Sequence, residues 1–432
     1  MTRATDRARL RRELVLLAAT VAVGCSAKPP DSSVTPAKYL FIWAGPQRSD
    51  SAAGNVHHPA AAVSDFLAVL DADPASATYG KVFASTAVGI AGAMAHHTEF
   101  TLPAGRALFA SDYMSGEVFL LDLADPLTPR LTHRIDSVPG FRRPHSFARL
   151  PSGNVVASLQ YGDGSLPGDP GGIAEFDPAG RLLRSASAAD SAFPGARLRT
   201  YGVEVLPAID RAVTTSTPMD NERTADVIQI WRLSDFKLLR TMLVPAVAGD
   251  SIHYYPFEIR ALSDGRKALL NTYYCGFYLL TGLETENPTV ALVHSMREPR
   301  RVGCSVPVVA GSYWVMPIAY DHRVVSLDLK EPSHPIEVSA LQTDSTFLPH
   351  WAAVDPGSDR IVIVGQEDGE ARVLMARLDR TTGKLSWDEG FRDANSARRG
   401  VSFDRRVWPH GAVTAAMPHA ALFGPARRYA RL

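Results

Sequence analysis

The stretch PHSFARLPSGNVVASL, from Pro144 to Leu159, contains the unit from which the fold of this chain can be inferred. A histidine opens a short alternating run, a turn with glycine follows, and a second strand-like run closes the unit. The unit recurs in three further segments, which are HHTEFTLPAGRALFAS from His96, HYYPFEIRALSDGRKALLNT from His253 and PHWAAVDPGSDRIVIVG from Pro349. Recurrence of strand, turn and strand in the same order indicates a repeat architecture.

The repeated unit continues into a third strand that ends in a polar residue. Two copies share an LDL-x-x-P pattern there, at Leu121 to Pro126 and at Leu327 to Pro332. Units of about 45 to 60 residues with up to four strands are typical of the blades of a β-propeller. Six or seven such units fit in residues 38–424, and we expect seven. The sequence therefore predicts an all-β, seven-bladed β-propeller.

The composition is that of a globular protein. The chain has 432 residues, of which 46% are hydrophobic and 21% charged, so it is long enough to bury a large core. Lys and Arg together number 45, as do Asp and Glu, and the formal net charge is zero. Because no excess of basic residues exists, nucleic acid is not an expected partner.

The first residues resemble an export signal rather than part of the fold. A basic segment precedes the apolar run Leu14 to Gly24, which is shorter than the roughly 20 residues that span a bilayer. We expect residues 1–24 to be a signal peptide, residues 25–37 a Pro/Ser-rich tether and residues 38–432 a single propeller domain. The residues AVGCS around Cys25 are similar to a bacterial lipobox, so lipidation at Cys25 and simple secretion are both open. Either reading places the protein in the cell envelope, at the membrane only through a lipid anchor, or outside the cell.

The chain has three cysteines. If Cys25 carries lipid, Cys275 and Cys304 remain, and they could pair in an oxidising compartment. Their sequence separation does not decide whether they do. Because the sequence has no CxxC motif, a zinc site built on thiolates is not expected.

The histidines of the repeats are candidates for a shared site. In a propeller the first strand of each blade lines the central axis, so a residue repeated at one point of that strand forms a ring around the axis. The histidines assigned to this position are His97, His145 and His350, with His410 repeating the Pro-His entry in VWPHGAV and His253 offset by a longer segment. Since neighbouring strand residues point to opposite faces, both can ligate only if His96 precedes the strand. The alternative is that one of the two ligates and the other supports it or packs between blades.

Imidazoles without thiolates suit copper, iron(II) or zinc. The carboxylates of Glu99 and Glu258 could orient the imidazole rings. The alternative is that these histidines only line the channel and bind water. Solvated positions are expected for the histidines of loops and outer strands, which are His57, His58, His133, His294, His322 and His334, while His419 is undecided.

Several segments resemble those of one family in the same order. DFLAVLDADPASATYGKV from Asp65, followed by the histidine pair, resembles the opening of the selenium-binding protein family, which includes methanethiol oxidase. GEVFLLDLADPLTPRLTHRI, PHSFARLPSGNVVAS, YPFEIRAL and LPHWAAVDPGSDRIVIVG are similar to later segments of that family. The resemblance runs from about residue 65 to residue 410. One departure is that TEFTLPAG, after the histidine pair, lacks the Cys-Ser-Ser-Cys cluster of vertebrate members.

This resemblance implies a seven-bladed propeller with a metal, copper in the bacterial methanethiol oxidases. It implies oxidation of methanethiol by O₂ and water to formaldehyde, hydrogen sulfide and hydrogen peroxide. By position it implies His96, His97, His145 and His410 as ligands, with His350 lining the same channel. Iron and zinc are the less favoured ions.

Two other functions compete with a copper oxidase of a small thiol. One is a non-catalytic propeller, similar to selenium-binding proteins, that binds a ligand or a protein partner, since fold alone does not separate binding from catalysis. The other is a calcium-dependent lactonase, which would need Glu, Asn and Asp along the channel, where this sequence offers mainly histidine.

Overall fold

The computed structural model describes residues 35–46, 63–91, 94–194, 196, 198–219, 224–296, 303–366, 368–404 and 406–425. Over these ranges the chain forms β-strands and two short 3-10 helices, η1 (Pro207–Ile209) and η2 (Ala319–Asp321). Neither of these helices has the length and apolar character that a membrane span requires. The predicted signal peptide, Cys25 and most of the tether lie outside the described residues.

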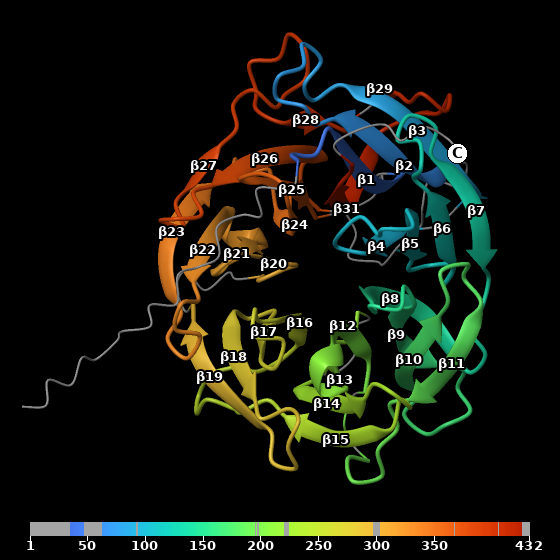
Figure 1. The fold of residues 1–432 in the computed structure, drawn as a ribbon, viewed down its shortest axis with the longest axis vertical. Coiled ribbons are helices and arrows are strands. Elements are labelled where there is room, and N and C mark those ends of the chain that lie inside the picture. Colours follow the sequence, from blue (N-terminus) through green and yellow to red (C-terminus); the bar gives the residue numbers. More distant parts are fainter. Residues whose placement is uncertain are drawn as a thin grey trace, which may run out of the picture.

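The strands form seven blades around a central axis, which confirms the predicted seven-bladed propeller (Figure 1). Each blade is an antiparallel sheet of four strands, and blade 7 carries one more. From the axis outward, blade 1 is β31 (Ala416–Phe423), β1 (Tyr39–Pro46), β2 (Ser64–Asp71) and β3 (Val82–Ala91); blade 2 is β4 (Ala95–Thr98), β5 (Ala107–Asp112), β6 (Val118–Asp122) and β7 (Arg130–Ile135); blade 3 is β8 (Phe141–Arg149), β9 (Val155–Gly162), β10 (Pro170–Phe176) and β11 (Leu182–Ser187); blade 4 is β12 (Thr200–Leu206), β13 (Arg211–Ser216), β14 (Val227–Arg232) and β15 (Leu238–Leu243).

The remaining blades have the same order. Blade 5 is β16 (Pro256–Ala261), β17 (Ala268–Thr272), β18 (Gly276–Thr281) and β19 (Thr289–Ser295); blade 6 is β20 (Val308–Ala310), β21 (Tyr313–Ile318), β22 (Arg323–Asp328) and β23 (Ile336–Gln342); blade 7 is β24 (Pro349–Val354), β25 (Arg360–Gly365), β26 (Arg372–Leu378) and β27 (Leu385–Trp387), with β28 (Val401–Ser402) also on β26. A small hairpin of β29 (Arg406–Val407) and β30 (Val413–Thr414) follows blade 7.

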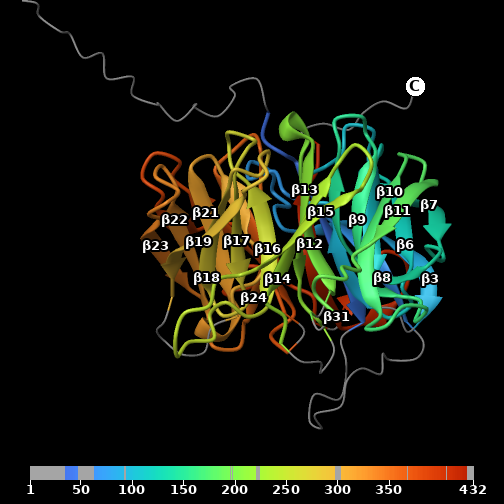
Figure 2. The ribbon, with the colours of Figure 1, turned by 90° about the horizontal axis from the view of Figure 1, so that it is seen from below.

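Blade 1 closes the ring with strands from both ends of the described chain. Its innermost strand, β31, pairs antiparallel with β1, and Leu40 lies opposite Phe423. Every residue of β31 is buried. Seen from the side, the blades stand next to one another and form a thick disc (Figure 2). The pairing of β31 with β1 therefore brings residues near the C-terminus to the axis.

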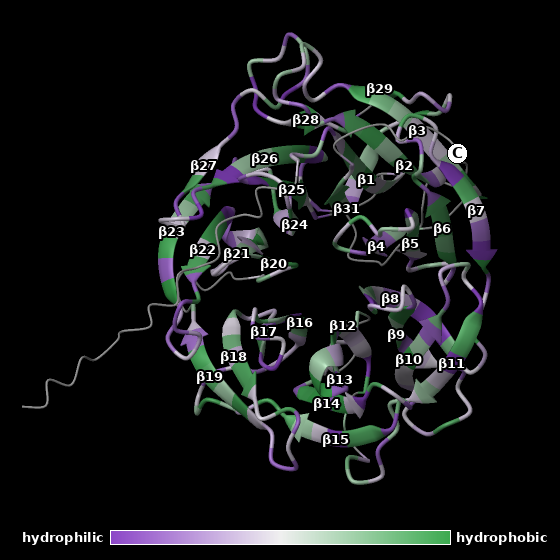
Figure 3. Ribbon diagram, in the orientation of Figure 1, coloured by the Kyte–Doolittle hydropathy of each residue, from purple (hydrophilic) through white to green (hydrophobic). Residues whose placement is uncertain are grey.

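The middle strands of the blades are buried on both faces. All residues of β9 and β10 are buried, whereas β7 and β11 are mostly exposed or half-buried. Figure 3 shows this as a hydrophobic middle layer and a more hydrophilic outer strand β7. Continuous apolar strands follow from blade-on-blade packing, because each middle strand meets a neighbouring blade on either side.

The hydrophobic clusters lie between successive blades. Between blades 5 and 6, for example, the side chains of Leu269 and Phe277 pack in one cluster with Trp314 and Val325. Burial of each such side chain stabilises the fold by about 1.5–3 kcal/mol. A blade therefore depends on its two neighbours, and the ring holds its inner strands in fixed positions.

The repeated units recognised in the sequence lie at equivalent places in four blades. Each supplies the first and second strands of blade 2, 3, 5 or 7. The LDL-x-x-P pattern ends the third strand in blades 2 and 6. There Asp122 Oδ1 accepts the N–H of Ala124 at 2.9 Å, and Asp328 Oδ1 accepts the N–H of Lys330 at 2.8 Å. The pattern thus encodes the same turn twice.

Cys275 and Cys304 form a disulfide, with Cα atoms 5.2 Å apart. Cys275 lies between β17 and β18, and Cys304 lies in the segment before β20. This segment also pairs with blade 7, where the N–H of Val306 donates to the carbonyl of His350 at 2.8 Å. The disulfide therefore joins blade 5 to a segment that supports the inner strand of blade 7.

Candidate metal centre

Five histidines of the inner strands meet near the propeller axis. They come from blades 7, 1, 2 and 3, which are neighbours in the ring, and each is at most 7% exposed. They are His96 and His97 of β4, His145 of β8, His350 of β24 and His419 of β31. The predicted convergence of inner-strand histidines is thus present in the structure. Four separate strands are needed to assemble the group.

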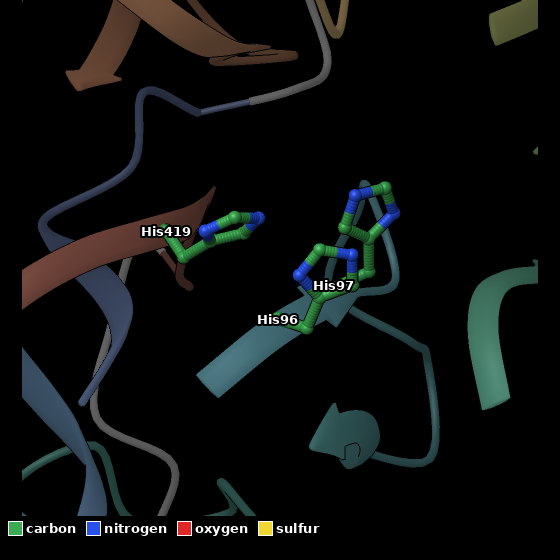
Figure 4. A group of neighbouring side chains, drawn as sticks. All are labelled: His96, His97 and His419. Atoms are coloured by element: carbon green, nitrogen blue, oxygen red, sulfur yellow. The ribbon is translucent and has the colours of Figure 1, made fainter. Parts of the chain in front are cut away.

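His96 lies at the middle of the group. Its ring centroid is 4.5 Å from that of His97, 4.6 Å from that of His145 and 4.4 Å from that of His419. Nitrogen atoms of His96, His97 and His419 lie within 4.8 Å of one another, and Figure 4 shows the His419 ring directed toward the histidine pair. His145 is 4.1 Å from His97, and His350 joins through His419 at 4.8 Å, both between ring centroids. This spacing can hold an ion between several imidazoles.

A bulge explains how two adjacent histidines share one site. In regular strand His96 and His97 would point to opposite faces. In β4, however, Ala95 pairs with Asp112 of β5 and Thr98 pairs with Ala110. Moving three residues along β4 therefore corresponds to moving two residues along β5. The extra residue breaks the alternation. Both histidines are therefore buried at the axis although both belong to the strand, an arrangement that neither sequence alternative described.

The same irregularity recurs in the other inner strands that bear site residues. The register shifts between Pro144 and Phe147 in β8, between Pro349 and Trp351 in β24, and between Pro418 and Ala420 in β31. The residues that have no paired partner at these shifts include His145, His350 and His419. A bulge in each of these four inner strands thus breaks the alternation of side chains at the histidines.

Two buried serines, Ser146 and Ser111, form hydrogen bonds with the histidines. Ser146 Oγ lies 3.0 Å from His97 Nδ1 and 2.9 Å from His145 Nδ1. Ser111 acts on the backbone instead, because its hydroxyl faces the carbonyl oxygens of His97 and His145 at 3.3 and 3.2 Å and accepts the N–H of His97 at 3.1 Å. The Nε2 atoms of His97 and His145 are buried without a hydrogen-bond partner. Buried polar atoms usually have a partner, and an imidazole nitrogen without one is suited to bind a metal ion.

Burial keeps the two best-defined imidazoles neutral. It lowers the pKa of His97 well below its ordinary value, and the neighbouring rings of His145, His96, His419 and His350 lower it further. Burial likewise lowers the pKa of His145, helped by His419, while the carbonyl of Tyr201 opposes the change. A neutral imidazole has the lone pair that a metal ion needs.

Aromatic residues form the other side of the group. Tyr201 of β12 has its ring centroid 3.7 Å from that of His145, and Phe257 of β16 lies 4.4 Å beyond Tyr201. Tyr113 is 5.4 Å from His96 between ring centroids, and its hydroxyl accepts a hydrogen bond from Arg143 Nη1 at 2.9 Å. The histidines are therefore bordered by the rings of two tyrosines, Tyr113 and Tyr201, and Phe257 packs on Tyr201.

His410, one of the four ligands implied by the resemblance, is not part of the group. It lies in the turn between β29 and β30, and Figure 1 places β29 at the rim of the disc. Its Nδ1 is 2.6 Å from Ser85 Oγ on the outer strand β3, and its ring packs on Phe66. His419 occupies the position proposed for His410. The sequence contained a usable signal, since Pro418 and His419 repeat the Pro-His entry of β8 and β24.

The other candidates lie close to the axis but have different partners. Glu99 receives hydrogen bonds from Arg149 at 2.6 and 2.7 Å, and Glu258 receives one from Arg260 at 2.7 Å. Burial raises the pKa of Glu258, and Arg260 opposes that shift. These carboxylates pair with arginines, and Ser146 makes the contacts to the imidazoles. His253 precedes β16, and its ring lies against Tyr254 with centroids 3.9 Å apart.

These features define a class of protein, a seven-bladed propeller with a buried cluster of inner-strand histidines. No family model matches the chain. It is 27% identical over 309 residues to the methanethiol oxidase of a Hyphomicrobium species, a match that covers 64% of this chain and 66% of that one. The chain is therefore similar to the selenium-binding protein and methanethiol oxidase family, as its sequence segments indicate.

Solved structures agree with the fold. A hypothetical selenium-binding protein from Sulfolobus tokodaii has a TM-score of 0.70 at 14% identity, covering 91% of this chain and 96% of that one. A periplasmic gluconolactonase from Pseudomonas aeruginosa has a TM-score of 0.58 at 12% identity, covering 90% of this chain and all (100%) of that one. At these identities the likeness concerns the propeller alone.

Proposed function

We propose that this protein is a metal-dependent oxidase of a small thiol, with methanethiol as the substrate. The reaction is CH₃SH + O₂ + H₂O → HCHO + H₂S + H₂O₂, in which the carbon is oxidised and O₂ takes up two electrons. The similarity to a methanethiol oxidase supports this substrate class. Because the match covers about two thirds of that relative, the whole activity is proposed for this chain and not carried over as a fact.

The observation that carries the proposal is the histidine group with its buried Nε2 atoms. His97 and His145 have no hydrogen-bond partner at Nε2, although both side chains are fully buried. Four imidazoles, from His96, His97, His145 and His419, would hold the ion, with His350 beside His419. The donor set of imidazole nitrogens without thiolate suits copper best among the candidate ions, ahead of iron and zinc.

When bound, a copper ion would favour the thiolate form of the substrate and mediate electron transfer to O₂. The chain's own residues supply the surroundings. Ser146 contacts two of the rings, Tyr201 places its ring beside His145, and Phe257 packs on Tyr201. These ring faces can pack against a methyl group and exclude water from it. The ring of Tyr113 lies beside that of His96, and its hydroxyl is hydrogen-bonded to Arg143 and Gln160.

An assay of methanethiol oxidation tests the proposed activity. The purified protein, supplied with copper, should consume O₂ and form hydrogen peroxide when methanethiol is added. His97→Ala and His145→Ala should each reduce this to background, because each removes a ligand. His334→Ala, at an exposed position on the outer side of blade 6, should keep full activity.

Two results would contradict the oxidase. Copper-loaded protein without peroxide formation from methanethiol would leave the non-catalytic, ligand-binding propeller as the better account. Full activity in both histidine variants would place any chemistry elsewhere in the molecule.

We further propose that the protein is exported to the cell envelope, with a signal peptide over residues 1–24, a tether over residues 25–37 and a lipid on Cys25. The buried disulfide between Cys275 and Cys304 supports an oxidising compartment. Mass spectrometry of the protein from its native cells should find Cys25 as the first residue, with lipid attached. Retention of residues 1–24 would contradict export, and a Cys25→Ala variant that stays at the membrane would contradict lipidation.

A further inference from the structure

Ser146 has an unusual position among the residues around the histidines. It follows His145 within the bulge of β8, and its side chain is 1% exposed. Its single hydroxyl oxygen contacts the Nδ1 atoms of two imidazoles, at 3.0 Å from His97 and 2.9 Å from His145. The backbone N–H of Ser146 donates to Ser158 Oγ at 3.0 Å, which fixes the residue in place.

The proton count at this hydroxyl decides which imidazole nitrogens can bind a metal. A hydroxyl has one proton to donate and two lone pairs, and a neutral imidazole carries one N–H. If Ser146 donates to one Nδ1, that imidazole keeps its proton on Nε2 and cannot ligate there. If Ser146 accepts from both, both imidazoles carry Nδ1–H. Both Nε2 atoms then present lone pairs, and these are the two atoms that the structure leaves buried without a partner.

We propose that Ser146 is a positioning residue that sets the tautomers of His97 and His145 together, so that both ligate through Nε2. The inference rests on the proposed metal centre and adds the residue that prepares its ligands. Partners on the far nitrogen of a ligating histidine fix ring orientation and tautomer, and their loss costs roughly 10- to 100-fold in metal affinity. A residue that serves two ligands at once should lie at the upper part of that range.

Ser111 provides a matched control. It is also a fully buried serine that contacts His97 and His145, but it bonds only their backbone atoms. A loss that came merely from removing a buried hydroxyl would affect Ser111→Ala as much as Ser146→Ala. A loss of affinity caused by a changed tautomer should be confined to Ser146→Ala. Ser146→Thr, which keeps the hydroxyl, should retain the wild-type affinity.

The experiment uses zinc as a diamagnetic probe ion. Competition with a chromophoric chelator gives the zinc affinity of the full chain and of the variants. Nitrogen–proton correlation spectra of the zinc-loaded proteins report which imidazole nitrogen carries the proton. We expect Nδ1–H on both His97 and His145 in the wild type, and a roughly 10- to 100-fold weaker affinity in Ser146→Ala with loss of at least one Nδ1–H signal. Ser111→Ala, which removes only backbone contacts, should show a smaller loss of affinity and keep both Nδ1–H signals.

Each other outcome has a distinct meaning. Wild-type affinity in Ser146→Ala, or equal losses in the two alanine variants, would overturn the role of Ser146 while leaving the metal centre intact. An Nε2–H on either histidine in the zinc-loaded wild type would overturn it as well. A wild type that binds no zinc and no copper would contradict the metal centre itself, and the inference with it.

Discussion

At the scale of residues, the ligand set depends on which C-terminal Pro-His pair reaches the axis. Pro409–His410 and Pro418–His419 fit the repeated pattern equally well in the sequence. Only the pairing of β31 with β1 separates them, and it joins segments from opposite ends of the chain. The repeats thus predicted His97, His145 and His350 near the axis, whereas His419 could not be chosen without the closed ring.

Replacing each of these two histidines by alanine distinguishes the ligand set implied by the resemblance from the one in the structure. We expect His419→Ala to lower bound copper sharply, because it removes a buried ring 4.4 Å from His96 between centroids. His410→Ala should keep wild-type copper, because its Nδ1 bonds Ser85 at the rim. Elemental analysis of the two purified variants checks this. Copper loss in His410→Ala with retention in His419→Ala would restore the ligand set implied by the resemblance.

The neutral buried imidazoles also predict a pH dependence of stability in metal-free protein. Burial holds the pKa values of His97 and His145 well below the ordinary value of about 6.5, so only the unfolded chain takes up protons as the pH falls toward 5.5. The free energy of unfolding should therefore decrease below about pH 6.5. Urea unfolding of chelator-treated protein at pH 7.5 and 5.5 measures it. The decrease should be smaller in a His97→Gln/His145→Gln variant, and an equal decrease in both proteins would refute this explanation.

At the scale of elements, the bulges explain what strand periodicity could not. Alternation predicted that adjacent histidines point to opposite faces, and the extra residue in β4 brings both to the axis. A bulge depends on the register with the partner strand, which a single run of residues does not encode. The disulfide was open for a related reason, since a separation of 29 residues says nothing of the distance between Cys275 and Cys304 in the fold.

The disulfide should stabilise the blades that it joins. In the chain-entropy description, closing a loop of this length contributes about 3–4 kcal/mol by restricting the unfolded chain. We expect a Cys275→Ser/Cys304→Ser variant to lose roughly that much free energy of unfolding, measured by urea denaturation. Ser152→Ala, at an exposed turn position between β8 and β9 of blade 3, provides a comparison. Equal midpoints for the wild type and the double serine variant would show that the disulfide contributes nothing to stability.

At the scale of the whole molecule, the histidine group can form only when the ring of blades is closed. Strand-and-turn repetition predicted the propeller and its seven blades, because each blade is encoded by a contiguous and similar unit. The closure was not encoded in that way, since blade 1 takes β31 from one end of the chain and β1 to β3 from the other. The histidine group has the same origin, as it needs β31 to lie beside β4.

Removing the closing strand should therefore affect folding and metal binding together. A chain that ends at Ala415 lacks β31, which is buried along its whole length, and leaves β1 without its inner partner. We expect this chain to lose cooperative thermal unfolding and to bind no copper. A chain that ends at Pro425 keeps β31 and should melt like the full protein. Cooperative melting of the shorter chain would show that the ring closes without β31.

The most direct test of the account is to locate the metal in crystals of the copper-loaded protein by anomalous scattering at the copper edge. We predict a single strong peak at the propeller axis, between the imidazoles of His96, His97, His145 and His419. No peak at this place in protein that contains copper by elemental analysis, or a peak held by His410 at the rim, would contradict the metal centre and the oxidase built on it.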